Sequence, residues 1–432
     1  MRTQDLAICY VGILLLLAGA SCTGGEYSVR DALRGLGASA GQSSVSDVGG
    51  ASGNIAGNGN TAGQLGGAGN LGSDTLMTAG MPQIGTQGSS VAGAASGCAN
   101  PVRERIPLVN DLYTADPSAR VFDGRIYIYP SHDVGPSSTA SSEIDSPVVA
   151  GSVDGDQYMM TDYHVYSMDN MLCSAVTDHG QVLRVEDVPW ASRQMWAPDA
   201  IRKNDTYYLY FPARDKSDLF RIGVATSKTP SGPFIPQAEP LAGSFSIDPA
   251  AFVDDDGQAY LYFGGLLGGQ LEHWQTGNYD PNAVEPGGQA LALGPRVAKL
   301  RYDMLGFDGG ASEIRILDER GLPLIAADTN RTFFEGVWVH KYQGTYYLSY
   351  STGMTHYLAW ATSNSPLGPF TYQGTLLEPV SGWTTHHSIL EWGGKWYLFY
   401  HDSALSGQDN QRNMKVMVFA RTDDGGLPTL VP

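Results

Sequence analysis

Apolar and aromatic residues alternate in five short runs between Arg125 and Asp402, and a pair of turn residues stands just ahead of each run. Another short, mostly apolar run precedes each turn. The turn pairs are Asp123-Gly124, Asn204-Asp205, Asp256-Gly257, Gln343-Gly344 and Gly393-Gly394. The runs after them read RIYIYPSHD from Arg125, TYYLYFPARD from Thr206, QAYLYFGG from Gln258, TYYLSYSTG from Thr345 and KWYLFYHDS from Lys395. Apolar runs joined by two turn residues predict five β-hairpins.

The hairpins recur at intervals of roughly 50 to 90 residues, which is typical of a repeated supersecondary unit. A single hairpin cannot bury both of its faces, whereas a ring of four-stranded sheets can. The pattern therefore predicts an all-β fold, a five-bladed β-propeller formed by residues 99–432. A segment of this length is ample for one sizeable core.

Three of the five units carry an acidic residue at nearly the same upstream position. Asp116, Asp248 and Glu335 precede the glycine of their turn by eight, nine and nine residues. The first strand of each propeller blade lies nearest the axis, so equivalent positions on three blades place three carboxylates around a common centre. An unpaired buried charge is expensive, so each acid needs a compensating partner or a function. A lone Asp-Pro is usually an ordinary turn or strand entry, but three acids in register favour a site.

Residues 1–22 predict a secretory signal. Leu6 to Ala20 is apolar and too short to span a bilayer comfortably, and small residues lead to Cys22. The segment resembles a bacterial lipoprotein signal with Cys22 as the lipidated residue, although Gly19 stands where that pattern usually has Leu. Cleavage without a lipid, or an uncleaved anchor, is the alternative. We therefore expect an exported protein, at the cell surface or in the periplasm through a lipid anchor, or otherwise secreted.

Residues 23–98 are rich in Gly, Ser, Ala and Asn and predict a flexible linker. Once Cys9 and Cys22 are assigned to the signal, Cys98 and Cys173 remain, either as a disulfide or as two free thiols.

The net charge of −18 argues against a nucleic-acid partner, which requires a basic face. It also disfavours anionic membranes and acidic polymers, and it is compatible with a neutral carbohydrate.

Three neighbouring carboxyl groups suit acid–base hydrolysis of a glycosidic bond. One carboxylic acid protonates the leaving oxygen, one carboxylate activates water, and about 6.5–9.5 Å between them leaves room for that water and inverts the anomeric centre. A third carboxylate nearby raises the pKa of the acid through like-charge repulsion.

The motifs TADPSARV, SIDPAAFV and FFEGVWV, in this order, resemble glycoside hydrolase family 43. The resemblance extends from about Asn100 to Val431 and also includes RQMWAPDAIRK. It implies a five-bladed β-propeller and an inverting mechanism that requires no cofactor. It further implies that Asp116 is the general base, Asp248 modulates the pKa of the acid, and Glu335 is the general acid.

The same resemblance implies weaker roles for five further residues. Trp196 is expected to form an apolar floor under a sugar, and Arg412 to contact the sugar; a core aromatic and a surface arginine are the alternatives. Asp199 is expected to bond a ligand hydroxyl or to cap its strand. Of the histidine pair, His386 is expected at the propeller axis beside a calcium or other ion, and His387 is expected to face the substrate.

Two insertions, Val134 to Tyr163 and Gly265 to Gly294, are long enough to close the site and define specificity. They are expected to do so because the sequence stops at Pro432, without the β-sandwich that many β-xylosidases of family 43 carry after the last blade.

The favoured substrates are arabinose- or xylose-containing carbohydrates of plant polysaccharides, cleaved as an α-L-arabinofuranosidase, a β-D-xylosidase or both. An exo-galactosidase or arabinanase of the same family and a non-catalytic carbohydrate-binding propeller are alternatives. A retaining fructosidase is disfavoured because the motif around Asp116 is Thr-Ala-Asp-Pro-Ser instead of Asn-Asp-Pro-Asn-Gly.

Overall fold

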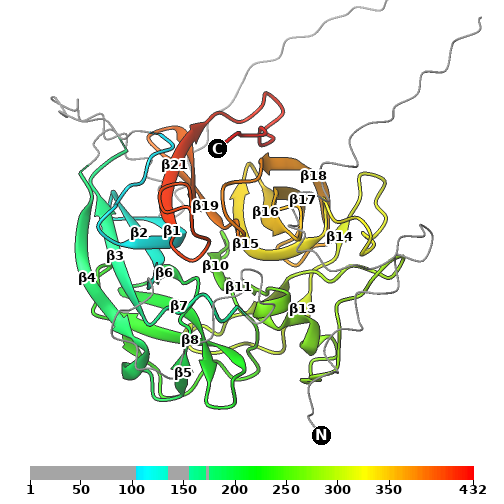
Figure 1. Cartoon of the computed structure of the whole chain (residues 1–432). Coiled ribbons are helices and arrows are strands. Elements are labelled where there is room, and N and C mark those ends of the chain that lie inside the picture. The colour runs from blue at the N-terminus through cyan, green and yellow to red at the C-terminus, as the bar shows by residue number, and fades with distance from the viewer. Residues whose placement is uncertain (1–103, 135–154, 172–174) are drawn as a thin grey trace, which may run out of the picture. The chain divides into compact units, whose positions relative to one another are not determined.

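The structure is a computed structural model that describes residues 104–134, 155–171 and 175–432 (Figure 1). All of these residues belong to one unit of the chain, Ser89–Pro432. The signal at 1–22, the lipidated Cys22, the linker at 23–98 and the Cys98–Cys173 pair lie outside the described residues and stay predictions. Within the described part, no helix is both long enough and apolar enough to cross a membrane.

The described strands form five sheets. The first holds β1 (Tyr113–Phe122), β2 (Arg125–Asp133), β3 (Asp162–Met168) and β4 (Thr177–Arg184). The second holds β5 (Ala191–Arg193), β6 (Asp199–Lys203), β7 (Thr206–Asp215), β8 (Phe220–Ser227) and β9 (Ile235–Pro236). The third holds β10 (Ala250–Val253), β11 (Ala259–Phe263), β12 (Arg296–Lys299) and β13 (Ser312–Glu313). The fourth holds β14 (Ile316–Leu317), β15 (Phe333–Tyr342), β16 (Thr345–Thr352), β17 (Leu358–Ser363) and β18 (Phe370–Leu377), and the fifth holds β19 (His387–Trp392), β20 (Lys395–Asp402) and β21 (Asn413–Phe419).

The sheets are the blades of a propeller, as the repeated hairpins predicted. The inner strands β1, β6, β10, β15 and β19 each pack against the next, and β19 packs against β1 (Figure 1). The segment before β1 closes the ring, because the backbone N–H groups of Arg105 and Leu108 donate to the carbonyls of Val416 and Met414 in β21. The last blade therefore uses both ends of the described chain.

Four of the five hairpin turns fall at the two residues that the sequence indicated. Asp123-Gly124, Gln343-Gly344 and Gly393-Gly394 have positive φ at both residues, which is the primed turn that matches strand twist. In the third blade the connection is longer, from Asp254 to Gln258, and the Asp254 N–H donates to the Gln258 carbonyl across it.

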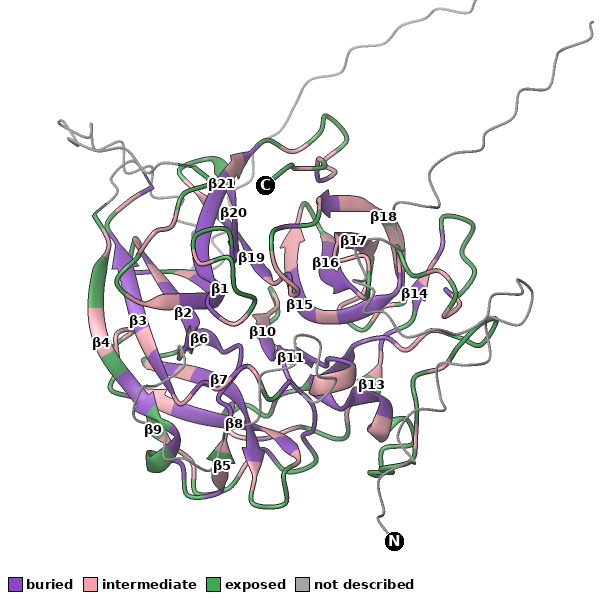
Figure 2. Cartoon of the chain, viewed as in Figure 1, coloured by how far each residue is buried: buried purple, intermediate pink, exposed green. Residues whose placement is uncertain are grey.

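The tyrosines at one position of the repeated phrase link the blades. Tyr129, Tyr210 and Tyr262 are all fully buried, and each donates its hydroxyl to a carbonyl in the segment of the next blade. The acceptors are Pro230, Met304 and Pro366, at 2.6, 2.8 and 2.8 Å. Each bond satisfies a hydroxyl that would be costly to bury unpaired. Figure 2 shows that the inner strands are mostly buried, so the core lies between the blades.

Candidate active site

Backbone irregularities place the three acids. The β1–β2 register breaks between Ala115 and Ser118, on either side of Asp116, and the β15–β16 register breaks around Glu335. Asp116 and Asp248 have φ values of +50° and +57°, a left-handed conformation that side-chain-bearing residues seldom adopt. Bulges and strained backbone of this kind concentrate beside functional sites, where they re-aim a side chain.

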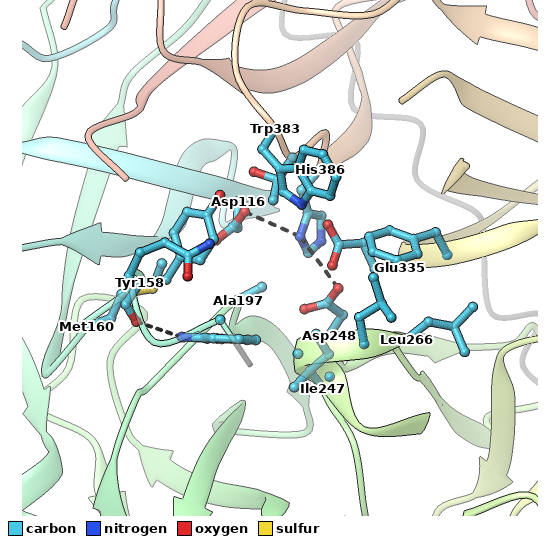
Figure 3. Close-up of a pocket in the computed structure, with 18 of the residues that line it drawn as sticks. Asp116, Tyr158, Met160, Ala197, Ile247, Asp248, Leu266, Glu335, Trp383 and His386 are labelled. Atoms are coloured by element: carbon cyan, nitrogen blue, oxygen red, sulfur yellow. Dashed lines mark hydrogen bonds and ion pairs between the residues drawn. The ribbon is translucent and has the colours of Figure 1, made fainter. Parts of the chain in front are cut away.

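Asp116, Asp248 and Glu335 line one cavity of about 240 Å³ (Figure 3). Its remaining walls are mostly apolar, and they include Tyr158, Met160, Trp196, Ile247, Leu266, Phe334 and Trp383. The volume is below the roughly 300–1,000 Å³ of pockets that hold drug-sized ligands. The cavity therefore suits a small unit such as one sugar ring, and it brings together the three acids that the repeats aligned.

Asp116 is held as a carboxylate. Ser131 donates its hydroxyl to Oδ2 at 2.5 Å, and Arg412 donates Nη1–H to Oδ1 at 3.2 Å. Burial alone would raise the pKa of Asp116, but the positive charge of Arg412 and the contact with His386 outweigh it and hold that pKa well below its usual value. Asp116 is therefore ionised near neutral pH.

Two fixed groups on the fifth blade orient this carboxylate. Arg412 also makes a two-pronged ion pair with Asp133, with Nε and Nη2 at 2.8 and 2.7 Å from its oxygens. His401 Nδ1 accepts the backbone N–H of Asp116 at 2.9 Å, and its Nε2 faces the Thr384 carbonyl at 3.1 Å. The network thus assigns a neutral His401 with its proton on Nε2, and burial lowers the pKa of His401 accordingly.

Glu335 and Asp248 have the opposite character. Burial, then the negative charge of Asp248, raises the pKa of Glu335 to about 8. Burial, together with the charge of Asp116, raises the pKa of Asp248 to about 6, even though the Gly336 N–H donates to Asp248 Oδ2 at 2.8 Å. Glu335 therefore carries a proton near neutral pH while Asp116 does not, and such a pair can act as acid and base.

His386 lies among the acids, as Figure 3 shows. Its Nδ1 is 3.5 Å from Asp116 Oδ1 and 4.0 Å from Asp248 Oδ2. Burial opposes protonation of this imidazole, but Asp248, Asp116 and Glu335 prevail and raise the pKa of His386 to about 9. A positive charge at this point offsets part of the repulsion among three carboxyl groups.

Trp196 lines the cavity, as expected, and is fixed by both predicted insertions. Its Nε1–H donates to the Tyr158 carbonyl at 2.9 Å, and its ring packs on Phe220 at 4.6 Å between centroids. A Cβ atom added to Gly155 would lie 2.4 Å from the Trp196 ring, and one added to Gly268 would lie 3.3 Å from it. The described part of the first insertion, 155–163, and the start of the second, Leu266 to Gly269, therefore line the site.

Two expected substrate contacts are corrected by the structure. Asp199, the first residue of β6, does not line the cavity; its carboxylate accepts hydrogen bonds from the Ser118 hydroxyl, the Arg120 guanidinium and the Ala251 N–H. It joins the first three blades and has no oxygen left for a ligand hydroxyl. His387 is also buried away from the cavity, where its Nε2 lies 2.6 Å from Ser349 Oγ.

The histidine that faces the cavity is therefore His386, and Arg412 lines the cavity as expected. Sequence reasoning missed Tyr158, Trp383, His401 and Asp133. Asp133 carried a signal, because it ends the first repeated run just where β2 meets the loop side of the sheet. His401 stands in the fifth repeated run, within β20, so its strand was predicted but the role of its side chain was not. Tyr158 and Trp383 stand in segments whose position no local pattern specifies.

The sequence model of glycosyl hydrolases family 43 matches residues 174–426, more than half of the 432 residues. The chain belongs to this family. The chain is 57% identical over 335 residues to the xylosidase/arabinosidase 43A of Humicola insolens, a match that covers 76% of this chain and 99% of the relative. It is 50% identical over 328 residues to a xylosidase/arabinosidase of Bacteroides ovatus, with 76% and 98% covered.

A solved structure of family 43 supports the same assignment. It is the β-xylosidase/α-arabinofuranosidase from a compost microbial metagenome, in complex with xylotriose and in a calcium-free form. The two chains are 52% identical, the TM-score is 0.71, and the match covers 76% of this chain and 98% of that one. The present protein is thus a glycoside hydrolase with a propeller fold.

Proposed function

We propose that this family 43 enzyme removes pentose residues from plant polysaccharides or oligosaccharides with inversion, as a β-D-xylosidase, an α-L-arabinofuranosidase or both. The observation that carries the proposal is the contrast between two carboxyl groups in one cavity. Arg412 keeps Asp116 ionised, and burial keeps Glu335 protonated. This contrast is what a base and an acid on either side of a glycosidic bond require.

In the proposed mechanism, Asp116 accepts a proton from a water molecule as that water attacks the anomeric carbon. Glu335 donates its proton to the leaving glycosidic oxygen, and the bond between that oxygen and the anomeric carbon breaks. Asp248 keeps the pKa of Glu335 high. After the reaction Asp116 is protonated and Glu335 is ionised. Both groups return to their starting protonation states when the product leaves and protons are exchanged with solvent.

The size of the cavity supports removal of terminal units over cleavage within a chain. A volume of about 240 Å³ bounded by Trp196, Tyr158 and Trp383 accommodates one sugar ring. The relative bound to xylotriose and the two relatives called xylosidase/arabinosidase favour a pentose. A galactosidase or arabinanase of the same family remains the alternative activity.

We also propose a calcium ion on the axial His386. Nδ1 of this imidazole points toward Asp116 and Asp248, which leaves Nε2 as the nitrogen that a cation would meet. Because a ligating nitrogen must give up its proton, the ion would replace the Nε2 proton of the metal-free imidazolium and take over its positive charge. Calcium prefers six to eight oxygen ligands, so one imidazole nitrogen is a sparse contribution from the protein and water would have to supply most of the ligands. Its charge would add to the field that favours ionised Asp116. Loss of calcium binding in His386→Gln, measured by calorimetry, is expected, and binding that persists in this variant would place the ion elsewhere.

For the protein in the cell, we propose export and lipid attachment at Cys22. Incorporation of radiolabelled palmitate that disappears in Cys22→Ser would support it, and equal labelling of both proteins would contradict it.

The activity is tested by incubating the protein with aryl pentosides and hexosides, then with arabinoxylan, arabinan and sucrose. Proton NMR before mutarotation should show release of the inverted pentose. Release of the retained anomer first would contradict the assigned mechanism, and turnover of hexosides or sucrose alone would contradict the assigned substrate. Binding of oligosaccharides without any turnover would favour a carbohydrate-binding propeller.

A further inference from the structure

A second cluster of side chains, all of types that can ligate a metal ion, lies in the first blade, away from the cavity. It consists of His132 near the end of β2 and of Asp162 and His164 on β3. Each offers one ligand atom, and these atoms all lie within 4.8 Å of one another. Among residues 104–134, 155–171 and 175–432, it is the one group of three or more such side chains that meets this distance.

The strand geometry explains why the three side chains meet. Asp162 and His164 are two residues apart on β3, so they project from the same face of the sheet. β2 and β3 run antiparallel, with Ile128 opposite Tyr166, and continuing this register brings His132 opposite Asp162. The cluster is thus built into paired strands, which position ligands more accurately than a loop does.

The distances are close to those of a metal centre. His132 Nδ1 lies 2.8 Å from Asp162 Oδ1, and His164 Nε2 lies 3.6 Å from Asp162 Oδ2. Ligand atoms of a tetrahedral zinc ion with bonds of 2.0–2.1 Å are about 3.3 Å apart. Small side-chain rotations would therefore bring all three atoms onto one ion.

The groups around the cluster fix its orientation. His164 Nδ1 lies 3.2 Å from both carboxylate oxygens of Asp178, so this ring presents Nε2 toward Asp162. Gln181 donates to Asp162 Oδ2 at 2.7 Å. A carboxylate on the far nitrogen of a ligating histidine is the usual support of a metal site, since it selects the tautomer and strengthens the ligand.

We propose that His132, Asp162 and His164 bind a divalent transition-metal ion, with zinc favoured by two imidazoles and one carboxylate. The side chains of His132 and His164 are 19% and 17% exposed, so solvent reaches the group and a water can complete the coordination. Three protein ligands and one water are a common zinc arrangement. Calcium is excluded as the preferred ion because it favours a larger set of oxygen ligands.

The ion would anchor the strands that lead to the active site. His132 precedes Asp133, which holds Arg412 in its ion pair. Tyr163 follows Asp162 and donates its hydroxyl to the Trp196 carbonyl at 2.5 Å. The metal is therefore assigned a structural role, fastening β2 to β3 beneath the cavity wall, with no part in the hydrolysis itself.

Zinc chloride is the probe, used with full-length, tag-free protein freed of metal by chelation. Titration calorimetry and metal analysis should give one zinc ion per chain. The melting temperature, measured by scanning calorimetry, should rise with the zinc concentration. His132→Gln and His164→Gln should each lower affinity at least about tenfold, and Asp178→Asn by about 10–100-fold. His179→Gln, on β4 of the same sheet, is the matched control and should bind as the wild type does. Cobalt in place of zinc should give the strong visible absorption of a four-coordinate ion, which both histidine variants should lose.

The proposal is overturned by wild-type zinc binding weaker than about 1 mM, or by unchanged affinity in both histidine variants. It is also overturned if His386→Gln alone abolishes binding, because the ion then lies at the propeller axis. If either histidine variant fails to fold, Asp178→Asn decides: it removes the supporting carboxylate from a partly exposed position, and unchanged zinc affinity in it contradicts the site.

Discussion

Asp248→Asn separates the electrostatic role of Asp248 from a purely structural one. The Gly336 N–H donates to Asp248 Oδ2, and an asparagine amide oxygen can still accept it, so the local backbone is expected to stay in place. The variant removes one negative charge beside Glu335. That charge is the second cause, after burial, of the rise in the Glu335 pKa to about 8 from an ordinary value of 4.5.

The direction of the effect follows from the active form of the acid. Glu335 is active when protonated, so kcat/KM falls as pH rises through its pKa, and this fall is the alkaline limb. Removing a like charge favours the ionised form and lowers that pKa. A charged neighbour in a buried site shifts a pKa by about 1–3 units, each equal to about 1.4 kcal/mol.

A second effect partly opposes the first. Asp248 is the main charge that raises the pKa of His386, so the variant also makes the imidazolium less stable. Loss of that positive charge would push the Glu335 pKa upward again. We therefore expect a net downward movement of the alkaline limb by about 1 unit, at the low end of the range.

The assay is kcat/KM on an aryl pentoside across pH 5 to 10, a range that contains both the alkaline limb near pH 8 and a limb about 1 unit lower. Asp256→Asn is the matched control, since it makes the same charge change at an exposed turn in the same blade and keeps an acceptor for the Gln258 N–H. An alkaline limb that stays in place in Asp248→Asn, with the fold intact, refutes the modulator role. An equal movement in both variants would trace the effect to net charge.

Three further predictions follow from the site. Glu335→Gln and Asp116→Asn should each lower kcat on a natural linkage by at least about 10²-fold; near wild-type turnover in either, with unchanged circular dichroism, would contradict the assigned roles. Gly155→Ala should lower kcat/KM at least about tenfold, because the added Cβ atom would displace Trp196. Gly124→Ala is the control: this glycine has a similar positive φ, but its added Cβ atom would have no neighbour within 4 Å, so kcat/KM should not fall. Equal losses in both variants would mean that backbone strain alone is responsible. Glu335→Gln should also stabilise the fold, because ionisation of Glu335 is easier in the unfolded chain and the native state therefore loses stability as pH rises from 4.5 toward about 8. In urea unfolding the variant should gain about 4 kcal/mol at pH 8 and nothing at pH 4. A gain that does not vary with pH would contradict this origin.

The hairpins and the three acids could be predicted because their signals are local. A turn pair between apolar runs specifies a hairpin, and the distance from an acid to the next turn glycine specifies its place on the inner strand. Asp199 stands six residues before Asp205, the second residue of its turn, instead of eight or nine, and it lies in the contact between blades. Asp116 and Glu335 sit at breaks in strand register. Spacing cannot reveal such a break.

The expectation that His387 faces the substrate failed because neighbouring residues on a strand point to opposite faces, so His386 and His387 do not both face the cavity. His386 stands just before β19 and faces the cavity, while His387 begins the strand and turns away. Tyr158 and Trp383 were beyond reach because they stand outside the strands, where periodicity says nothing about direction.

The closing of the ring by the two ends of the chain has a consequence for biosynthesis. The proposed base, Asp116, emerges early from the ribosome, but Arg412, which keeps it ionised, follows 296 residues later, and His401 follows 285 residues later. A growing chain can already hold the first four blades and still lack the charge that sets its base. Hydrolytic competence therefore requires the fifth blade, so a copy terminated before Arg412 would be inactive even if much of it had folded.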